Sequence, residues 1–147
     1  MSKEFINRKI ITSSHEETKK MGKRFAQMLS PGDVVAFSGE LGSGKTTLIQ
    51  GICGGLGVKN CVRSPCFVII NEYNGKFKVY HFDLYRLDNE KELEDLGYEE
   101  YFYGDGVCLV EWAEKAGGLL PGQRIQVNLK ILSERKREIQ IKGRGAK

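Results

Sequence analysis

The segment Gly39–Thr46, which reads Gly-Glu-Leu-Gly-Ser-Gly-Lys-Thr, constrains the fold of this chain more than any other feature. It matches the phosphate-loop pattern G-x-x-x-x-G-K-[ST] in full. Before it, the run 33–39 has the composition of a short buried strand, and after it, apolar residues from Leu48 to Leu56 recur at helical spacing. A strand, a glycine-rich loop and a helix in this order predict a P-loop NTPase fold of the α/β class.

The residue types within the loop predict its chemistry. Glycines let backbone N–H groups turn inward on phosphates, at a helix N-terminus that already favours anions. Lys45 is expected to span the outer phosphates, and Thr46 to offer its hydroxyl to Mg²⁺. The segment is therefore predicted to bind a nucleotide with its metal.

A hard cation with about six oxygen ligands needs more than the Thr46 hydroxyl, so we expect an acid from the end of a neighbouring strand. Glu111 ends the apolar run 107–110, and Asp83 ends an aromatic run that is followed by Arg86. One acid is expected to help hold Mg²⁺, directly or through water, while the other can orient the attacking water. The sequence alone does not assign the two roles.

Three further features accompany these acids. His81 is interpreted as a packing or hydrogen-bonding histidine, and Trp112 as a large packing residue beside the site. Ser64 and Pro65 lie where P-loop switch proteins carry a segment that senses the terminal phosphate. An ordinary loop into a strand explains them equally well, and both interpretations stay open.

The rest of the chain predicts a mixed central sheet flanked by helices, with antiparallel hairpins. Ser14 and Glu17 have the spacing of a capping box at the start of an amphipathic helix. Neither repeats nor a linker interrupt the chain, so residues 1–147 are predicted to form a single P-loop ATPase domain. The other expected elements are a hairpin of 66–73 and 77–85 around Asn74-Gly75, a helix in 89–102 closed or interrupted by Gly97, and a hairpin of 123–132 and 137–143.

Composition excludes several classes of protein. The chain has 147 residues, a net charge of +4 and no apolar run near the length that spans a bilayer, so no membrane role is expected. Its N-terminus lacks the apolar core of a secretory signal, which predicts a cytoplasmic protein. The 4 cysteines form no C-x-x-C pair and are interpreted as reduced. The basic C-terminal stretch is interpreted as a solvated edge, with contact to RNA the less favoured alternative.

Four segments in order, GELGSGKTT (39–47), SPCFVIINEY (64–73), YHFDLYRL (80–87) and LVEW (109–112), resemble the bacterial TsaE family, ATPases of tRNA threonylcarbamoyladenosine biosynthesis. The resemblance extends from Ile10 to about Ile141. It implies Mg²⁺ at Thr46 and Glu111, and a role in hydrolysis for Asp83. It also implies that His15 lies near the adenine and that Arg137 reaches the nucleotide. The residues implied to bind ATP are Leu41, Gly42, Ser43, Gly44, Lys45, Thr46, Thr47, His15 and Arg137.

The resemblance also implies a partner, a TsaB–TsaD heterodimer that transfers the threonylcarbamoyl group to the adenosine beside the anticodon. This chain would support or reset that complex, with only indirect contact to tRNA. One departure is that Cys66 stands where the family usually has threonine after Ser-Pro. That substitution removes a hydroxyl from the switch segment.

Alternative functions use the same loop. A small-metabolite kinase is the leading one, but acids dominate 89–106, where a kinase lid would carry arginines for phosphate. A GTPase should show N-K-x-D and D-x-x-G motifs, and neither is present. A module that holds nucleotide without turnover is the third alternative, which a measurement of hydrolysis would distinguish.

Overall fold

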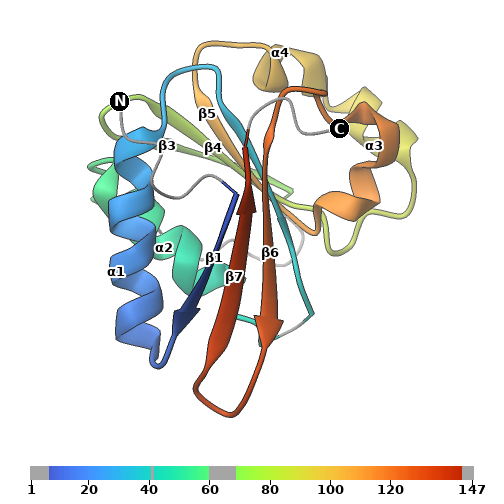
Figure 1. The fold of residues 1–147 in the computed structure, drawn as a ribbon. Helices are drawn as coiled ribbons and strands as arrows, with labels where there is room; N and C mark the ends of the chain where they lie inside the picture. The colour runs from blue at the N-terminus through green and yellow to red at the C-terminus, as the bar shows by residue number, and fades with distance from the viewer. Residues whose placement is uncertain (1–6, 41, 60–68, 144–147) are drawn as a thin grey trace.

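The computed structural model describes residues 7–40, 42–59 and 69–143. Within them a seven-stranded sheet has helices on both faces (Figure 1). The strand order is β1-β7-β6-β2-β5-β4-β3. The strands are β1 (Arg8–Thr12), β2 (Val34–Ser38), β3 (Ile70–Asn74), β4 (Lys78–Asp83), β5 (Val107–Glu111), β6 (Ile125–Ile131) and β7 (Arg137–Lys142).

The centre of the sheet is parallel and its borders are antiparallel. Strand β2 pairs in parallel with β5 and β6, and β5 pairs in parallel with β4. The antiparallel pairs are β3 with β4, β6 with β7 and β1 with β7. Strands covered on both faces should be continuously apolar, and every residue of β5 is buried. The predicted mixed sheet with antiparallel hairpins is confirmed.

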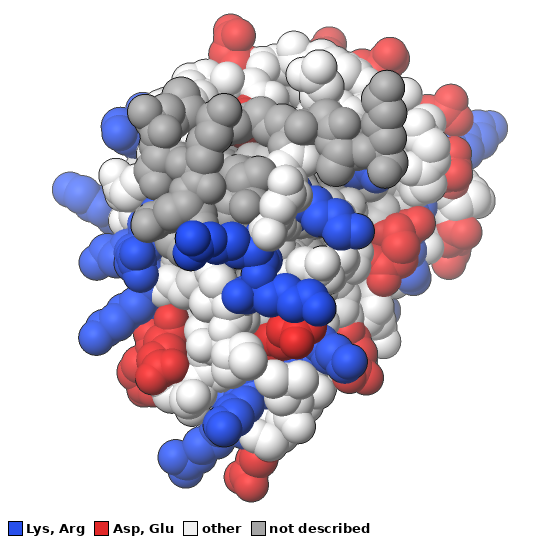
Figure 2. All heavy atoms as spheres, in the orientation of Figure 1, with Lys and Arg blue, Asp and Glu red and all other residues white. Residues whose placement is uncertain are grey.

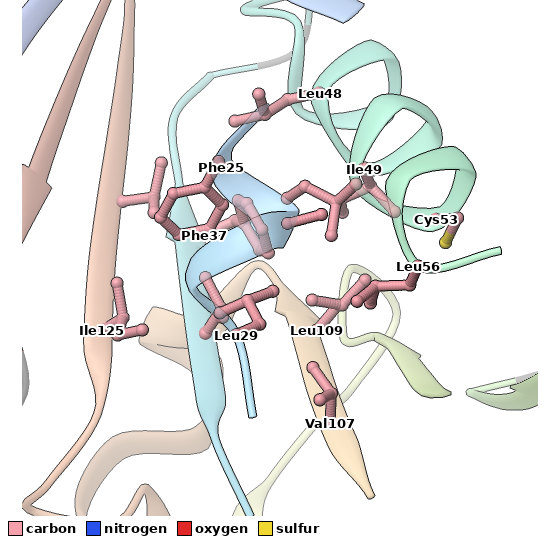
Figure 3. Close-up of a cluster of buried hydrophobic side chains, with 14 of the residues drawn as sticks. Phe25, Leu29, Phe37, Leu48, Ile49, Cys53, Leu56, Val107, Leu109 and Ile125 are labelled. Atoms are coloured by element: carbon pink, nitrogen blue, oxygen red, sulfur yellow. The ribbon is translucent and has the colours of Figure 1, made fainter. Parts of the chain in front are cut away.

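Helices α1 (His15–Phe25) and α2 (Lys45–Gly55) cover one face of the sheet, with the 3₁₀ turn η1 (Ala26–Met28) continuing α1. Alternate strand residues, such as Phe37 of β2 and Leu109 of β5, point into this layer and pack among Phe25, Leu48 and Ile52. Figure 3 shows several of these side chains meeting between α2 and the strands. The phosphate-loop helix is therefore fixed to the sheet by the main hydrophobic core.

Short elements cover the opposite face. They are α3 (Glu90–Asp95), α4 (Tyr98–Phe102) and the 3₁₀ segment η2 (Ala113–Leu119). Ala36 and Val110, which alternate with the residues of the first layer, pack here with Phe82 and Phe102. Gly97, at φ +73°, separates α3 from α4, so it interrupts the predicted helix of 89–102. Of the two alternatives, an interrupting rather than a closing glycine is confirmed.

Helix α1 begins at a capped end, as its sequence predicts. The Ser14 hydroxyl accepts a hydrogen bond from Glu17 N at 3.1 Å. The Glu17 carboxylate accepts from Ser13 N at 2.8 Å, one residue before the position expected of a capping box. Both bonds satisfy backbone donors at the entry to the helix and fix how the chain passes from β1 into α1.

Glycines allow α1 and α2 to cross closely. A Cβ added to Gly51 would lie 2.1 Å from Lys19 O, and one added to Gly22 would lie 2.5 Å from Leu48 O. A Cβ at Gly54, on the outer side of α2, would meet nothing within 4 Å. Glycine is therefore a packing requirement on the inner side of α2, where any side chain would push α1 away.

The two predicted hairpins are present, and a strand that the sequence did not predict joins them in the sheet. The first hairpin pairs Asn74 with Lys78, so its turn is 75–77. A Cβ on Gly75 would lie 2.5 Å from Leu56 O, because this turn packs on the end of α2. Strand β1 lies at the sheet edge against β7, with Ile11 59% exposed. Its sequence, RKIIT, lacks the polar-apolar alternation that marks a strand.

On the visible face Lys and Arg are most numerous on the left and in the middle, and Asp and Glu are most numerous along the top and right, with some of each sign among the other (Figure 2). Figure 2 shows Lys and Arg with Asp and Glu among them, in the orientation of Figure 1. The turn 132–136 before β7 is exposed throughout. No helix in the described parts of the chain combines the length and apolar character needed to cross a membrane.

Candidate nucleotide-binding site

The carboxyl ends of three neighbouring strands form the floor of the candidate site. In the sheet register Glu111 of β5 is opposite Phe37 of β2 on one side and Asp83 of β4 on the other. The chain leaves β2 directly into the phosphate loop. Ligands of open α/β sheets bind outside the carboxyl ends of the parallel strands, so loop and acids share the expected edge.

The loop has backbone conformations that favour glycine. The φ angles of Gly39, Gly42 and Gly44 are +151°, +81° and +101°. At Gly39 space is also short, because an added Cβ would lie 2.7 Å from both Leu129 O and Ser43 Oγ. These glycines let the chain turn tightly between β2 and α2 without a side chain in the turn.

Helix α2 starts with backbone donors that the helix itself does not satisfy. Its N-cap is Gly44, which supplies no side-chain cap, and the first helical hydrogen bond runs from Leu48 N to Gly44 O at 2.9 Å. The backbone N–H groups of Lys45, Thr46 and Thr47 therefore have no acceptor within the helix. Together with the helix dipole they form an anion site directly after the loop.

Lys45 is 5% exposed and is held at the centre of the loop. Its ammonium donates to Gly39 O and, at 3.3 Å, to Glu40 O. Burial lowers the pKa of Lys45, while the carboxylates of Glu111, Glu114, Asp83 and Glu40 act in the opposite direction. An incoming phosphate would supply the countercharge that the two carbonyl groups provide only in part.

Trp112 forms one wall of the lysine environment. The Lys45 ammonium lies 3.9 Å from the centroid of its ring, close enough for a cation–π interaction. The Trp112 backbone is left-handed, with φ +55°, which is strained for a bulky residue. Its ring also packs on Tyr85, with centroids 5.0 Å apart. The strained residue thus holds an aromatic surface between Lys45 and the end of β4.

The two acids have different surroundings. Glu111 is 6% exposed, and its Oε2 lies 2.7 Å from His81 Nε2. Asp83 is half-buried, and its Oδ1 accepts from Tyr85 N at 3.1 Å, in the turn after β4. One carboxylate is therefore fixed inside the site and the other lies at its rim. His81 is a hydrogen-bonding histidine, one of the two roles that its sequence position suggested.

A cavity of about 490 Å³ opens beside the loop, between the start of α1 and the turn before β7. Arg137 Nε donates to Gly42 O at 3.2 Å, which ties β7 to the phosphate loop. Thus His15 and Arg137, far apart in sequence, line one cavity next to the loop. Its lining residues are Ser14, His15, Glu16, Thr18, Gly44, Glu134, Arg135 and Arg137.

The residues present fit a nucleotide phosphate and a hard cation. Ser43 Oγ is buried and has no hydrogen-bond partner among the described residues. The described ranges hold no cluster of three or more His, Cys, Asp or Glu side chains that could hold a metal. Thr46, which is exposed, and Glu111 can supply two oxygen ligands. Mg²⁺ fits this arrangement, because it is commonly held by few protein ligands together with phosphates and water.

Comparison with known proteins decides the family. A family model described as "Threonylcarbamoyl adenosine biosynthesis protein TsaE" matches residues 12–139. The chain belongs to the TsaE family. The match spans the loop, both acids, His15 and Arg137, and it confirms the resemblance drawn from the four sequence segments.

Individual TsaE proteins match over most of their length. The chain is 48% identical to the protein from Bacillus subtilis over 87% of this chain and 80% of that one. The protein from Treponema pallidum is 34% identical, with 89% and 97% covered. The crystal structure of YdiB from Bacillus subtilis superposes with a TM-score of 0.76 at 41% identity, covering 91% of this chain and 83% of that one. The fold and the place in tRNA threonylcarbamoyladenosine biosynthesis follow from these matches.

Some residues that the sequence singled out lie outside the described ranges. They are Leu41 of the loop and Ser64, Pro65 and Cys66 of the candidate switch segment. The sequence prediction missed Glu134 and Arg135 as lining residues of the cavity. The charged turn 133–136 could have indicated these two residues. It leads directly into Arg137, so it must lie close to the groups that Arg137 contacts.

Proposed function

We propose that this chain is a Mg²⁺-dependent ATPase of the cytoplasm that supports threonylcarbamoyl modification of the tRNA adenosine next to the anticodon. It would act on a TsaB–TsaD partner complex, with tRNA contacted indirectly. The observation that carries the proposal is the convergence of the phosphate loop, Glu111 and Asp83 at one edge of the sheet. Family membership supports the pathway.

Nucleotide binding would use the donor groups at the end of the loop and the start of α2. The first N–H groups of α2 and the Lys45 ammonium would bind the phosphates. His15 and Arg137 line the cavity beside Gly44, which supports a place there for the base and sugar. ATP binding would also replace the carbonyl partners of Lys45 with charged oxygens, which form stronger hydrogen bonds.

Thr46 and Glu111 would hold the metal, which when bound would neutralise charge on the outer phosphates. Burial and the contact with His81 support Glu111 rather than Asp83 as the metal-holding acid, since a ligand must keep a fixed direction. Asp83, at the rim, would accept a hydrogen bond from the attacking water and orient it. The residue pattern alone left these two roles unassigned, the family resemblance implied this assignment, and the burial of Glu111 supports it.

Family membership disfavours the small-metabolite kinase. The acidic side chains at 90–100 that argued against a phosphate-binding lid lie in α3 and α4. These helices pack over the face of the sheet away from α1 and α2 (Figure 1). The partner-directed ATPase is therefore the function that fits both family and site.

The proposed function can be tested in bacterial cells depleted of their own TsaE protein. Expression of this chain is expected to restore threonylcarbamoyladenosine in tRNA, measured by mass spectrometry of tRNA nucleosides. Lys45→Ala, expressed to the same level, should not restore it, because the phosphate loop loses its countercharge. Equal restoration by both forms would exclude a role for nucleotide, and restoration by neither would exclude the proposed pathway role.

A further inference from the structure

His81 and Glu111 form a buried pair between neighbouring strands. His81 Nε2 lies 2.7 Å from Glu111 Oε2, and the two residues are 8% and 6% exposed. His81 comes from β4 and Glu111 from the end of β5, and these strands pair in parallel. Each side chain is thus held by a backbone that the sheet already fixes.

The direction of the hydrogen bond follows from the chemistry of the two groups. A carboxylate that holds a metal is ionised and only accepts hydrogen bonds, so with Glu111 in that role the imidazole donates from Nε2. His81 Nδ1 is buried and has no hydrogen-bond partner among the described residues. A histidine kept only for packing stability would normally satisfy both nitrogens. In the described residues, the one hydrogen bond of the His81 ring is to Glu111, the candidate metal ligand.

We propose that His81 is a positioning residue that orients Glu111 for Mg²⁺; this inference rests on the proposed function. Donation to Oε2 restricts rotation of the carboxylate and leaves Oε1 outside the bond for the cation. Mutation of a residue that hydrogen-bonds to a metal ligand typically lowers metal affinity or activity by about 10–100-fold. His81 itself touches neither nucleotide nor metal, and it acts through Glu111.

Two amide substitutions separate this role from simple packing. The amide nitrogen of glutamine can approach the position of the histidine Nε2, whereas asparagine is one bond shorter and places its amide near Nδ1. His81→Gln should therefore keep the donor to Glu111, and His81→Asn should lose it. Val79→Ala is the matched control, because Val79 is buried on the same face of β4, two residues away from His81.

The experiment measures binding of ATP by calorimetry across a Mg²⁺ titration and in excess EDTA, alongside Mg²⁺-dependent hydrolysis. His81→Asn is expected to raise the half-saturating Mg²⁺ concentration about tenfold or more, with metal-free ATP binding within about twofold of wild type. His81→Gln should stay within about threefold of wild type in both measurements. Val79→Ala should lower the thermal midpoint without changing the Mg²⁺ dependence.

The possible failures are distinguishable. Absence of ATP binding by the wild-type protein would overturn the proposed function itself. If the wild type binds ATP, equal Mg²⁺ dependence of wild type and His81→Asn would overturn the positioning role. So would equal defects in the asparagine and glutamine variants, or a defect in His81→Asn that persists in EDTA. Circular dichroism confirms folding, and if the asparagine variant does not fold, a tenfold defect in a folded glutamine variant contradicts the inference.

Discussion

Lys45→Ala is expected to weaken ATP binding by about 100-fold or more, because the outer phosphates lose a buried, preorganised cation. Calorimetric titration with ATP and Mg²⁺ measures the effect. Lys115→Ala is the matched control, since Lys115 is an exposed lysine that donates to Tyr85 O near the same tryptophan. The control should bind ATP within about twofold of wild type.

The thermal stability of Lys45→Ala shows whether a loss of ATP binding comes from the missing ammonium group or from unfolding of the protein. Burial lowers the pKa of Lys45, which means that its surroundings disfavour the charged form. Removing a partly compensated buried charge should leave the thermal midpoint of the nucleotide-free protein unchanged or higher. A variant that binds ATP as wild type would exclude Lys45 from the site. A variant that unfolds would show instead that the lysine holds the loop together.

Glu111→Gln is expected to have the second large effect, on metal dependence. The substitution keeps size and an oxygen that can accept from His81 Nε2, and it removes the negative charge that would hold Mg²⁺. Hydrolysis at a fixed Mg²⁺ concentration should fall by about 100-fold or more. ATP binding in EDTA should be unchanged or tighter, because a negative charge near the phosphates is gone.

Glu114→Gln is the control for this prediction. Glu114 is an exposed carboxylate close enough to influence the pKa of Lys45, and it is not a strand-end residue. Its substitution should leave the Mg²⁺ dependence of hydrolysis within about twofold of wild type. An unchanged metal dependence in Glu111→Gln would remove Glu111 from the metal site and return that role to Asp83.

Local sequence was enough to predict those helices, strands and turns whose characteristic residues follow one another directly along the chain. The strand, loop and helix around Gly39–Thr46 follow one another without interruption, so each supports the interpretation of the next. Both hairpins have strong β-forming residues on either side of a turn. The strand β1 was missed because it is a short edge strand with an exposed isoleucine, and its place in the sheet depends on pairing with the distant strand β7.

The candidate site was predictable only in part, because its members come from distant elements. Strand-end acids were predictable one at a time, but that Asp83 and Glu111 lie opposite each other depends on the pairing of β4 with β5. The contact of His81 with Glu111 depends on the same register, which no local pattern encodes. His15 and Arg137 came from family resemblance, and the structure places both around one cavity.

The central claim is that this chain turns over ATP in the service of a partner. ATP hydrolysis by the purified protein, measured with Mg²⁺ or EDTA and with or without a TsaB–TsaD pair, tests it most directly. We expect slow turnover by the chain alone, faster turnover with the pair and none in EDTA. Fast hydrolysis without a partner, or no hydrolysis with the pair and Mg²⁺ present, would contradict the account.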